Sequence, residues 1–322
     1  MATQNDPFGR NGLTSLLLLL LATMGLPAAE TPSEPKSVPR MQVVPMPYHQ
    51  ASFQRDGVEL ARYHFGPALH RPFLFPVIGP SGRSLTRMGH PHDPESHGHH
   101  NSVWISHHDV NGTNSWSDAG KGKIRHKRIV KFADADNGAS LIAENEWVNG
   151  AGEVLLFETR RITTLPLAKG EWLLAIDMDF KPKDRKVTLG KTPFGIIGVR
   201  MAKTIGVSDG SGTIRNSEGA VNEKEVFWKR AKWVDYSGAI TNDKVEGITL
   251  FDHPDNPNFP TYFHVRNDGW MGASLTFDGP REIRPGQTLR LSYGLYIHSG
   301  IKPAEAINAT WQRFTKIRPA DG

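Results

Sequence analysis

The chain of 322 residues contains no cysteine. Disulfide bonds, cysteine-ligated metal centres and thiol catalysis are therefore all excluded. The motifs of several enzyme classes are also missing, because there is no G-x-S-x-G elbow, Walker A loop, dinucleotide-binding fingerprint or H-E-x-x-H pair in the sequence. These absences argue against a nucleotide-dependent enzyme and against a zincin metalloprotease.

Long apolar runs are scarce as well, and the longest lies at the N-terminus. Arg10 precedes the run at residues 13–26, which is followed by "PAAE". A positive residue, an apolar core and small residues in this order predict a secretory signal peptide over residues 1–29, cleaved near Ala28 or Ala29. The run is too short and too close to the N-terminus to favour a spanning helix, although an uncleaved anchor is the alternative. We therefore expect a periplasmic or extracellular protein whose mature chain does not span a membrane, with a disordered, proline-rich leader at residues 30–47.

The charge pattern points to no polyanionic partner. The formal net charge is +5, and only residues 121–128, "KGKIRHKR", are densely basic. A solvated strand edge or loop explains this stretch better than a contact with phosphate or an anionic polymer. Together with the predicted export, this pattern argues against nucleic acid as a partner.

Helical periodicity is nearly absent and predicts one short helix, at residues 303–317. Elsewhere, short alternating or apolar runs are separated by Gly, Pro, Asn and Asp, which is typical of antiparallel strands. Asp56-Gly57 lies between two such runs and predicts a tight hairpin. We therefore expect an all-β protein: one large antiparallel β-sandwich domain at residues 48–318, with a short C-terminal helix.

The segment "ESHGHHNSVWISHHDVNG" at residues 95–112 is the densest concentration of chemically active side chains. On an extended strand, Val103 and Ile105 would face the core, and His99 and His107 would lie about 26 Å apart, too far to share a metal ion unless the strand bends. The segment therefore divides into a loop trio and a pair at the strand end. Acid–base or substrate contacts, metal binding and a merely polar rim all remain open for these residues. The candidate catalytic residues are His97, His99, His100, His107 and Asp109.

Two further regions place polar and aromatic side chains where a ligand could bind. At residues 247–270 a strand ends at Asp252 and leads into a proline-rich loop, and residues 226–238 alternate aromatic and charged side chains. Ordinary turn residues and a buried strand are the alternatives for these two regions. The candidate ligand-binding residues from these regions and from the charged strand positions are Glu158, Arg160, Arg200, Trp233, Asp252, His253, Asn256 and His264.

An ordered set of motifs over residues 50–315 resembles a known family. They are "RPFLFPVIGPSG", "HGHHNSVWISHHDVNG", "GVR", "WKRAKWVDYSG", "GITLFDHPDNP" and "LRLSYGLYIHSG". This set is similar to that of the PmoA-like family of exported bacterial proteins, often called methane oxygenase PmoA. The resemblance implies a supersandwich like that of galactose mutarotase, and it adds Asn111 to the ligand-binding candidates. Against the family's D-H-P-H-H-R-G pattern, the chain departs at Ser96, Gly98, Asn101 and Ser102, and His108 replaces a usual glycine, so we expect His108 to be incidental.

Sequence and resemblance together suggest a carbohydrate-active protein that acts on or binds a glycoside or sugar derivative through a His/Asp-rich cleft. As an enzyme it would hydrolyse, eliminate or epimerise its substrate by histidine or carboxylate acid–base chemistry, with Arg160 or Arg200 stabilising negative charge. One alternative is a non-catalytic glycan-binding module, and another is a copper or other metal-dependent oxidase, as the family name suggests. The expected partner is a small molecule or an oligosaccharide. The sequence requires no cofactor and would accommodate a divalent metal.

Overall fold

The structure is a computed structural model that describes residues 36–93, 95 and 97–317. The predicted signal peptide and the position of Ser96 lie outside the described residues. Residues 36–38 are assigned to a separate unit, and from Pro39 onward the described residues form one compact unit. Among the described residues, no helix is long and apolar enough to cross a membrane.

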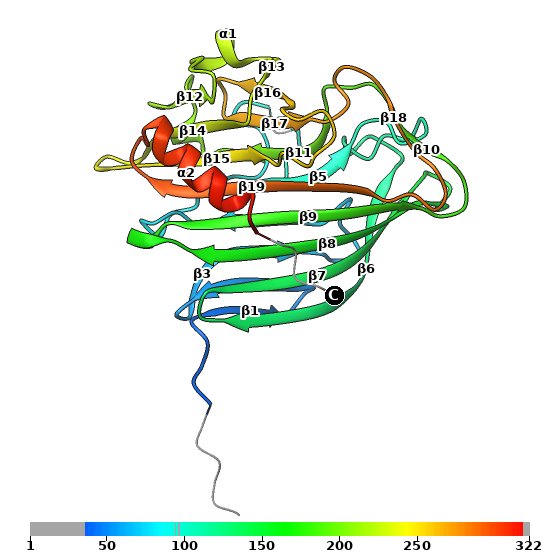
Figure 1. The fold of residues 1–322 in the computed structure, drawn as a ribbon, viewed down its shortest axis with the longest axis horizontal. Coiled ribbons are helices and arrows are strands. Elements are labelled where there is room, and N and C mark those ends of the chain that lie inside the picture. The colour runs from blue at the N-terminus through cyan, green and yellow to red at the C-terminus, as the bar shows by residue number, and fades with distance from the viewer. Residues whose placement is uncertain (1–35, 94, 96, 318–322) are drawn as a thin grey trace, which may run out of the picture. The chain divides into compact units, whose positions relative to one another are not determined.

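Antiparallel pairings link most strands into one 17-stranded sheet (Figure 1). Within it, two continuous series of paired strands can be distinguished, and each is called a wall. In spatial order the first wall contains β6 (Lys123–Ala135), β7 (Gly138–Val148), β8 (Val154–Pro166), β9 (Trp172–Pro182), β19 (Leu289–Ser299), β15 (Lys244–Asp252), β14 (Trp233–Thr241) and β12 (Thr213–Asn216). The second wall contains β1 (Met41–Met46), β2 (Gln50–Arg55), β3 (Val58–His64), β4 (Phe73–Val77), β5 (Val103–His107), β11 (Gly195–Arg200), β17 (Trp270–Ser274), β16 (Tyr262–Arg266) and β13 (Lys229–Arg230).

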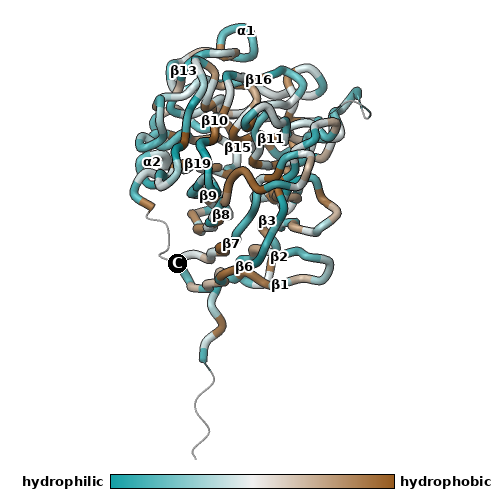
Figure 2. Tube along the Cα trace, turned by 90° about the vertical axis from the view of Figure 1, so that its right-hand side faces the viewer, coloured by the Kyte–Doolittle hydropathy of each residue, from teal (hydrophilic) through white to brown (hydrophobic). Residues whose placement is uncertain are grey.

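The two walls share one hydrophobic core. A single buried cluster contains Phe53 and Ile197 from the second wall and Leu174 and Ile176 from the first. The walls are also joined at one edge, where Met41 of β1 pairs with Ala135 of β6. Figure 2 shows hydrophobic and hydrophilic residues in succession along the trace. Along most of β8, buried and more exposed positions alternate, as expected when one face of a strand is turned toward the core.

The smaller elements lie outside this sheet. A separate two-stranded ladder pairs β10 (Val187–Leu189) with β18 (Arg281–Ile283). Helix α1 spans Asn222–Val226 and α2 spans Ala304–Phe314. Two 3-10 turns, at Ala168–Gly170 and Lys203–Ile205, complete the described elements. Helix α2 packs through Ile307 and Phe314 on a second apolar cluster, which includes Leu173 of β9 and Phe251 of β15.

The predicted fold class is confirmed: the protein is mostly β, with a large antiparallel sheet and a short C-terminal helix. The predicted hairpin is also present, because Asp56 and Gly57 both have positive φ angles, of 52° and 77°, between β2 and β3. The predicted leader extends too far, however. Met41–Met46 forms β1 and pairs with all of β2, and its buried side chains Met41 and Val43 belong to the core.

A charged pair is buried within the first wall. The Arg160 guanidinium donates two hydrogen bonds to the Glu158 carboxylate, at 2.6 and 3.0 Å, and the indole of Trp147 donates a third at 2.7 Å. Both charged side chains are almost fully buried. The two charges therefore compensate each other inside the protein, and neither side chain has an exposed surface for a ligand to contact.

Replacing Glu158 by Gln should therefore destabilise the fold. The substitution leaves a buried guanidinium without its counter-charge, and we expect the free energy of unfolding to fall by roughly 3–5 kcal/mol. Chemical denaturation of the purified protein measures this change. The control is Glu144→Gln, which breaks an exposed pair with Arg128 and should cost less than about 1 kcal/mol. Equal effects of the two substitutions would contradict the assignment.

Candidate functional site

A cavity of about 390 Å³ lies on the second wall, on the face opposite the shared core. On β5, Val103 and Ile105 point into the core while Trp104 belongs to a separate aromatic cluster. The same alternation places Arg200, Trp270 and His264 of β11, β17 and β16 on the cavity side. The lining residues are His90, His97, His99, His100, His108, Trp116, Ser117, Phe194, Arg200, His264, Arg266, Asp268 and Trp270.

The strand register explains how the floor of the cavity is built. Trp104, Gly198, Gly272 and His264 lie opposite one another on four adjacent strands. The glycines leave room for indole rings, since a Cβ atom added at Gly198 would lie 2.5 Å from the ring of Trp270. The indole rings therefore lie over the glycine positions, in space that any larger side chain at Gly198 or Gly272 would occupy.

His100 is held between two of these rings. Its imidazole stacks on Trp104 and Trp270, with centroid distances of 5.5 and 5.4 Å. It ends the turn at residues 97–100, which Arg71 ties to the rest of the site by hydrogen bonds to Asn101 and to the backbone carbonyls of Ser115 and Trp116. Asn101, one of the departures from the family pattern, therefore serves as an acceptor for a buried guanidinium.

Asp268, in the turn between β16 and β17, organises the polar wall of the cavity. Its Oδ1 accepts a hydrogen bond from Nη1 of Arg200, and its Oδ2 accepts one from Nε2 of His90, both at 2.8 Å. Burial alone would raise the pKa of Asp268, but the hydrogen bonds and charges of Arg200 and His90 lower it below the ordinary value. Nδ1 of His90 accepts the backbone N–H of His92, so Nε2 carries the proton given to Asp268.

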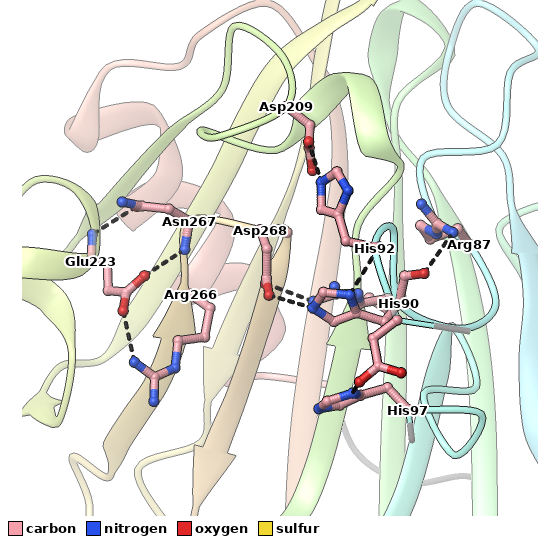
Figure 3. A network of polar contacts seen from close by, with 12 residues as sticks. Arg87, His90, His92, His97, Asp209, Glu223, Arg266, Asn267 and Asp268 are labelled. Carbon is pink, nitrogen blue, oxygen red and sulfur yellow. Dashed lines mark hydrogen bonds and ion pairs between the residues drawn. The ribbon is translucent and has the colours of Figure 1, made fainter. Parts of the chain in front are cut away.

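Further charged contacts hold the rim (Figure 3). His92 pairs with Asp209, and Nδ1 of His97 lies 2.9 Å from Asp93. On the opposite side, Arg266 pairs with Glu223 at 2.7 Å and covers the ring of Phe227. The segment between β4 and β5 is thus tied to several distant parts of the chain, which positions its histidines before any ligand arrives.

Several buried polar atoms in the cavity have no hydrogen-bond partner among the described residues. They are both ring nitrogens of His264, Nδ1 of His100, and Nε and Nη2 of Arg200. Burial and the charge of Arg266 lower the pKa of His264 to about 4. Burial, with smaller effects of neighbouring histidines and Arg200, lowers that of His100 to about 2. Both rings are therefore neutral at pH 7, and each has a ring nitrogen without a hydrogen-bond partner among the described residues. Buried polar groups are normally satisfied, so this concentration indicates a binding site.

The structure separates the predicted catalytic residues. His97, His99 and His100 line the cavity, whereas His107 is completely buried on the other side of β5. Its Nδ1 accepts the N–H of Asp109, and its Nε2 donates to the hydroxyl of Thr276. Asp109 accepts the backbone N–H of Gly112 and shapes the following turn. These two residues have structural roles, and the expectation that they share a cleft with the trio is not met.

The predicted ligand-binding residues are also divided. Arg200 and His264 line the cavity. Asn111 instead bonds to the backbone of Lys186 and Thr188, Glu158 and Arg160 form the buried pair described above, and the indole of Trp233 bonds to Asn308 beneath α2.

Asp252, His253 and Asn256 form a local arrangement at the end of β15. Asp252 accepts hydrogen bonds from the Asn256 amide and the Thr261 N–H, while burial raises its pKa to about 7. His253 accepts the N–H of Asp255 and packs against Phe314. None of the three lines the cavity, so the structure does not bring these ligand-binding candidates to the histidine trio.

Sequence reasoning missed several lining residues. His90, Asp268, Trp116 and Phe194 were not candidates, and His108, which was expected to be incidental, lines the cavity. A usable signal existed for His90, since "HPHD" at residues 90–93 extends the histidine-rich stretch upstream. Nothing in the local sequence indicated that Asp268 lies beside Arg200.

The histidines do not form a metal centre. Among residues 36–93, 95 and 97–317, no group of three or more His, Asp or Glu side chains is arranged to hold a metal ion. Several rings instead lie against one another, with centroids 4.8 Å apart for His90 and His97 and 4.6 Å apart for His99 and His100. The described side chains therefore give no support to the metal-dependent oxidase that the resemblance suggests.

Fold and site together define an all-β sandwich protein with a histidine- and tryptophan-lined cavity on one wall. A model described as a family of unknown function (DUF6807) matches residues 50–312, so the chain belongs to that family. No curated protein gives a significant match.

Two solved structures show a similarity to this chain that is too low to support a conclusion about its fold. One is a galactose mutarotase related enzyme from Lactobacillus acidophilus, with 10% identity and a TM-score of 0.37, covering 74% of this chain and 95% of that one. The other is a GalM/aldose epimerase homologue from C. elegans, with 9% identity and a TM-score of 0.35, covering 81% and 99%. Similarity at this level carries no conclusion about activity.

The buried histidines should make stability depend on pH. Burial lowers the pKa of His107 to about 4, as for His264, so the unfolded state binds more protons between about pH 6.5 and 4. Each histidine should then lower the free energy of unfolding by roughly 2–3 kcal/mol as the pH falls through this window. Asp252, whose pKa is raised to about 7, titrates with the opposite sign.

Comparing variants isolates these contributions. Chemical denaturation between pH 7 and pH 4 should show a smaller loss of stability for His107→Gln than for the wild type, and a larger loss for Asp252→Asn. Identical pH slopes in all three proteins would show that these groups do not titrate as described.

Proposed function

We propose that the cavity binds a carbohydrate or sugar derivative and that its neutral histidines exchange a proton with it. The observation that carries this proposal is the set of nitrogens on His264, His100 and Arg200 that have no hydrogen-bond partner among the described residues, on cavity-lining side chains around an aromatic floor. Aromatic faces pack against the C–H surfaces of a sugar, while a few well-placed polar groups fix its hydroxyls. A cavity of about 390 Å³ suits one or two sugar rings.

His264 is the best placed group for proton transfer. It is only 5% exposed, and its low pKa keeps a lone pair available at neutral pH. Arg200 lines the same cavity and would stabilise the negative charge that develops when a C–H or O–H proton leaves the ligand. Elimination or epimerisation of a sugar derivative uses this combination of a neutral base and a fixed cation.

A non-catalytic glycan-binding module is the second candidate, and Trp228 favours it. Its side chain is 42% exposed. The ring stacks on Phe227 at 4.4 Å and lies 6.4 Å from the ring of His264. This exposed indole beside the cavity could support a second sugar ring without any chemistry.

The setting of this activity is also a proposal. The apolar run at residues 13–26 supports export to the periplasm or the extracellular space, and the resemblance to the PmoA-like family supports the same assignment. A metal-dependent oxidase finds no support in the arrangement of the described side chains.

Replacing His264 by Gln tests the two candidates against each other. A thermal-shift screen of neutral sugars, keto-sugars and sugar acids first identifies a ligand, and product formation is then followed with it. For an enzyme we expect turnover to fall by roughly 100-fold or more, while ligand affinity changes by less than about tenfold. A binding module would show no turnover in either protein and only weaker binding in the variant.

The matched control is His49→Gln, because His49 is exposed and does not line the cavity. It should behave as the wild type in both assays. If no saccharide in the panel binds the wild-type protein, the proposed function is wrong.

A further inference from the structure

We propose that the ligand carries a carboxylate, held by the Nε–Nη2 edge of Arg200, so that the protein recognises a sugar acid such as a uronic acid or its glycoside. This inference rests on the proposed function and specifies its substrate class. It is carried by the position of Arg200 and by the part of its guanidinium that has no hydrogen-bond partner among the described residues.

Arg200 is rigidly placed and completely buried, with 0% of its surface exposed. It ends β11, where its N–H donates to the carbonyl of Ser102 at 2.7 Å and its own carbonyl accepts the N–H of Arg87 at 3.0 Å. The neighbouring strand positions hold Trp270, opposite Arg200, and Arg266, opposite Trp270. The guanidinium is therefore pre-positioned by the sheet, which lowers the cost of ordering it on binding.

Only one side of the guanidinium is used within the described protein. Nη1 donates to Asp268, whereas Nε and Nη2 have no partner among the described residues. In a planar guanidinium, Nε–H and one Nη2–H point in parallel from the same edge. That edge matches the two oxygens of a carboxylate, which accept both hydrogen bonds at once.

Leaving this edge unpaired is costly, because an arginine stays protonated even when buried. A buried donor without an acceptor costs on the order of a hydrogen bond, and more when it is charged. Asp268 does not relieve this, because it accepts only from Nη1 of this guanidinium, and Nε and Nη2 have no partner among the described residues. A ligand that supplies two acceptor oxygens in one plane removes the cost.

The unpaired edge itself favours a carboxylate over a neutral diol. Each arginine beside the cavity already has a counter-charge, because Arg200 pairs with Asp268 and Arg266 pairs with Glu223. Vicinal hydroxyls could also accept from the Nε–Nη2 edge, but a carboxylate accepts both hydrogen bonds in one plane, and its charge strengthens them.

The test compares each acid with a neutral ligand of nearly the same shape. Isothermal titration calorimetry would measure the binding of glucuronic and galacturonic acid, their methyl esters, and glucose and galactose to the purified protein. We expect at least one acid to bind roughly tenfold or more tightly than its methyl ester, because the ester loses the charge-assisted pair. Arg200→Lys keeps the positive charge but loses the fork, and it should abolish most of this preference.

The matched control is Arg161→Lys on β8, an arginine paired with Asp179 outside the cavity, which should keep the full preference. Thermal unfolding of each variant checks its fold. If Arg200→Lys does not fold, a crystal structure with the bound acid decides instead. Carboxylate oxygens within roughly 3 Å of both Nε and Nη2 support the proposal, and a carboxylate held elsewhere overturns it.

The remaining outcomes separate this inference from the proposed function. If the sugars and methyl esters bind as tightly as the acids, the carboxylate assignment is wrong while the carbohydrate function stands. If a folded Arg200→Lys variant still binds the acid more tightly than its methyl ester, another group binds the carboxylate and the assignment to Arg200 is wrong. If none of these ligands binds the wild-type protein, both proposals fail together.

Discussion

The site depends on one half-buried carboxylate, that of Asp268. A fully buried guanidinium such as Arg200 requires a counter-charge, and Asp268 supplies it while also fixing the proton of His90. Through these two contacts the turn between β16 and β17 is joined to the end of β11 and to the segment before β5. The cavity therefore exists only where these three parts of the chain meet. The other polar groups of the cavity, above all His264, lie beside these three parts of the chain.

The fold could be predicted well because its signals are local. Alternating apolar residues, the Asp56-Gly57 turn and the single amphipathic stretch near the C-terminus each act within a few residues. The exception is β1, where prolines on both sides resembled a flexible leader. Pairing with β2 and the burial of Met41 outweighed that local composition. A local sequence pattern does not show which strand a segment will pair with or how deeply its side chains will be buried.

The candidate site was harder to predict, for a different physical reason. A polar residue near a strand end looks the same in sequence whether its partner is its own backbone or a ligand. His107 and Asp109 satisfy each other and the neighbouring turn, whereas His264 has both nitrogens open. The strand alternation that placed Val103 and Ile105 toward the core also placed His107 there, which was sufficient to question a catalytic role. The contact between Arg200 and Asp268 spans 68 residues of sequence and leaves no comparable local trace.

The construction of the floor has a consequence for how this site can diversify. Trp104 and Trp270 fit into space left by glycines of adjacent strands, so changing them would disturb the sheet itself. The segment between β4 and β5, in contrast, also makes side-chain contacts outside the strand pairing, such as those of His90 and His92 and that of Asn101 with Arg71. Each contact can be exchanged without altering strand pairing. New ligand preferences should therefore arise by substitutions in the segment between β4 and β5, while the aromatic floor of the cavity stays the same. Ligand specificity can then change during evolution without a change in the fold.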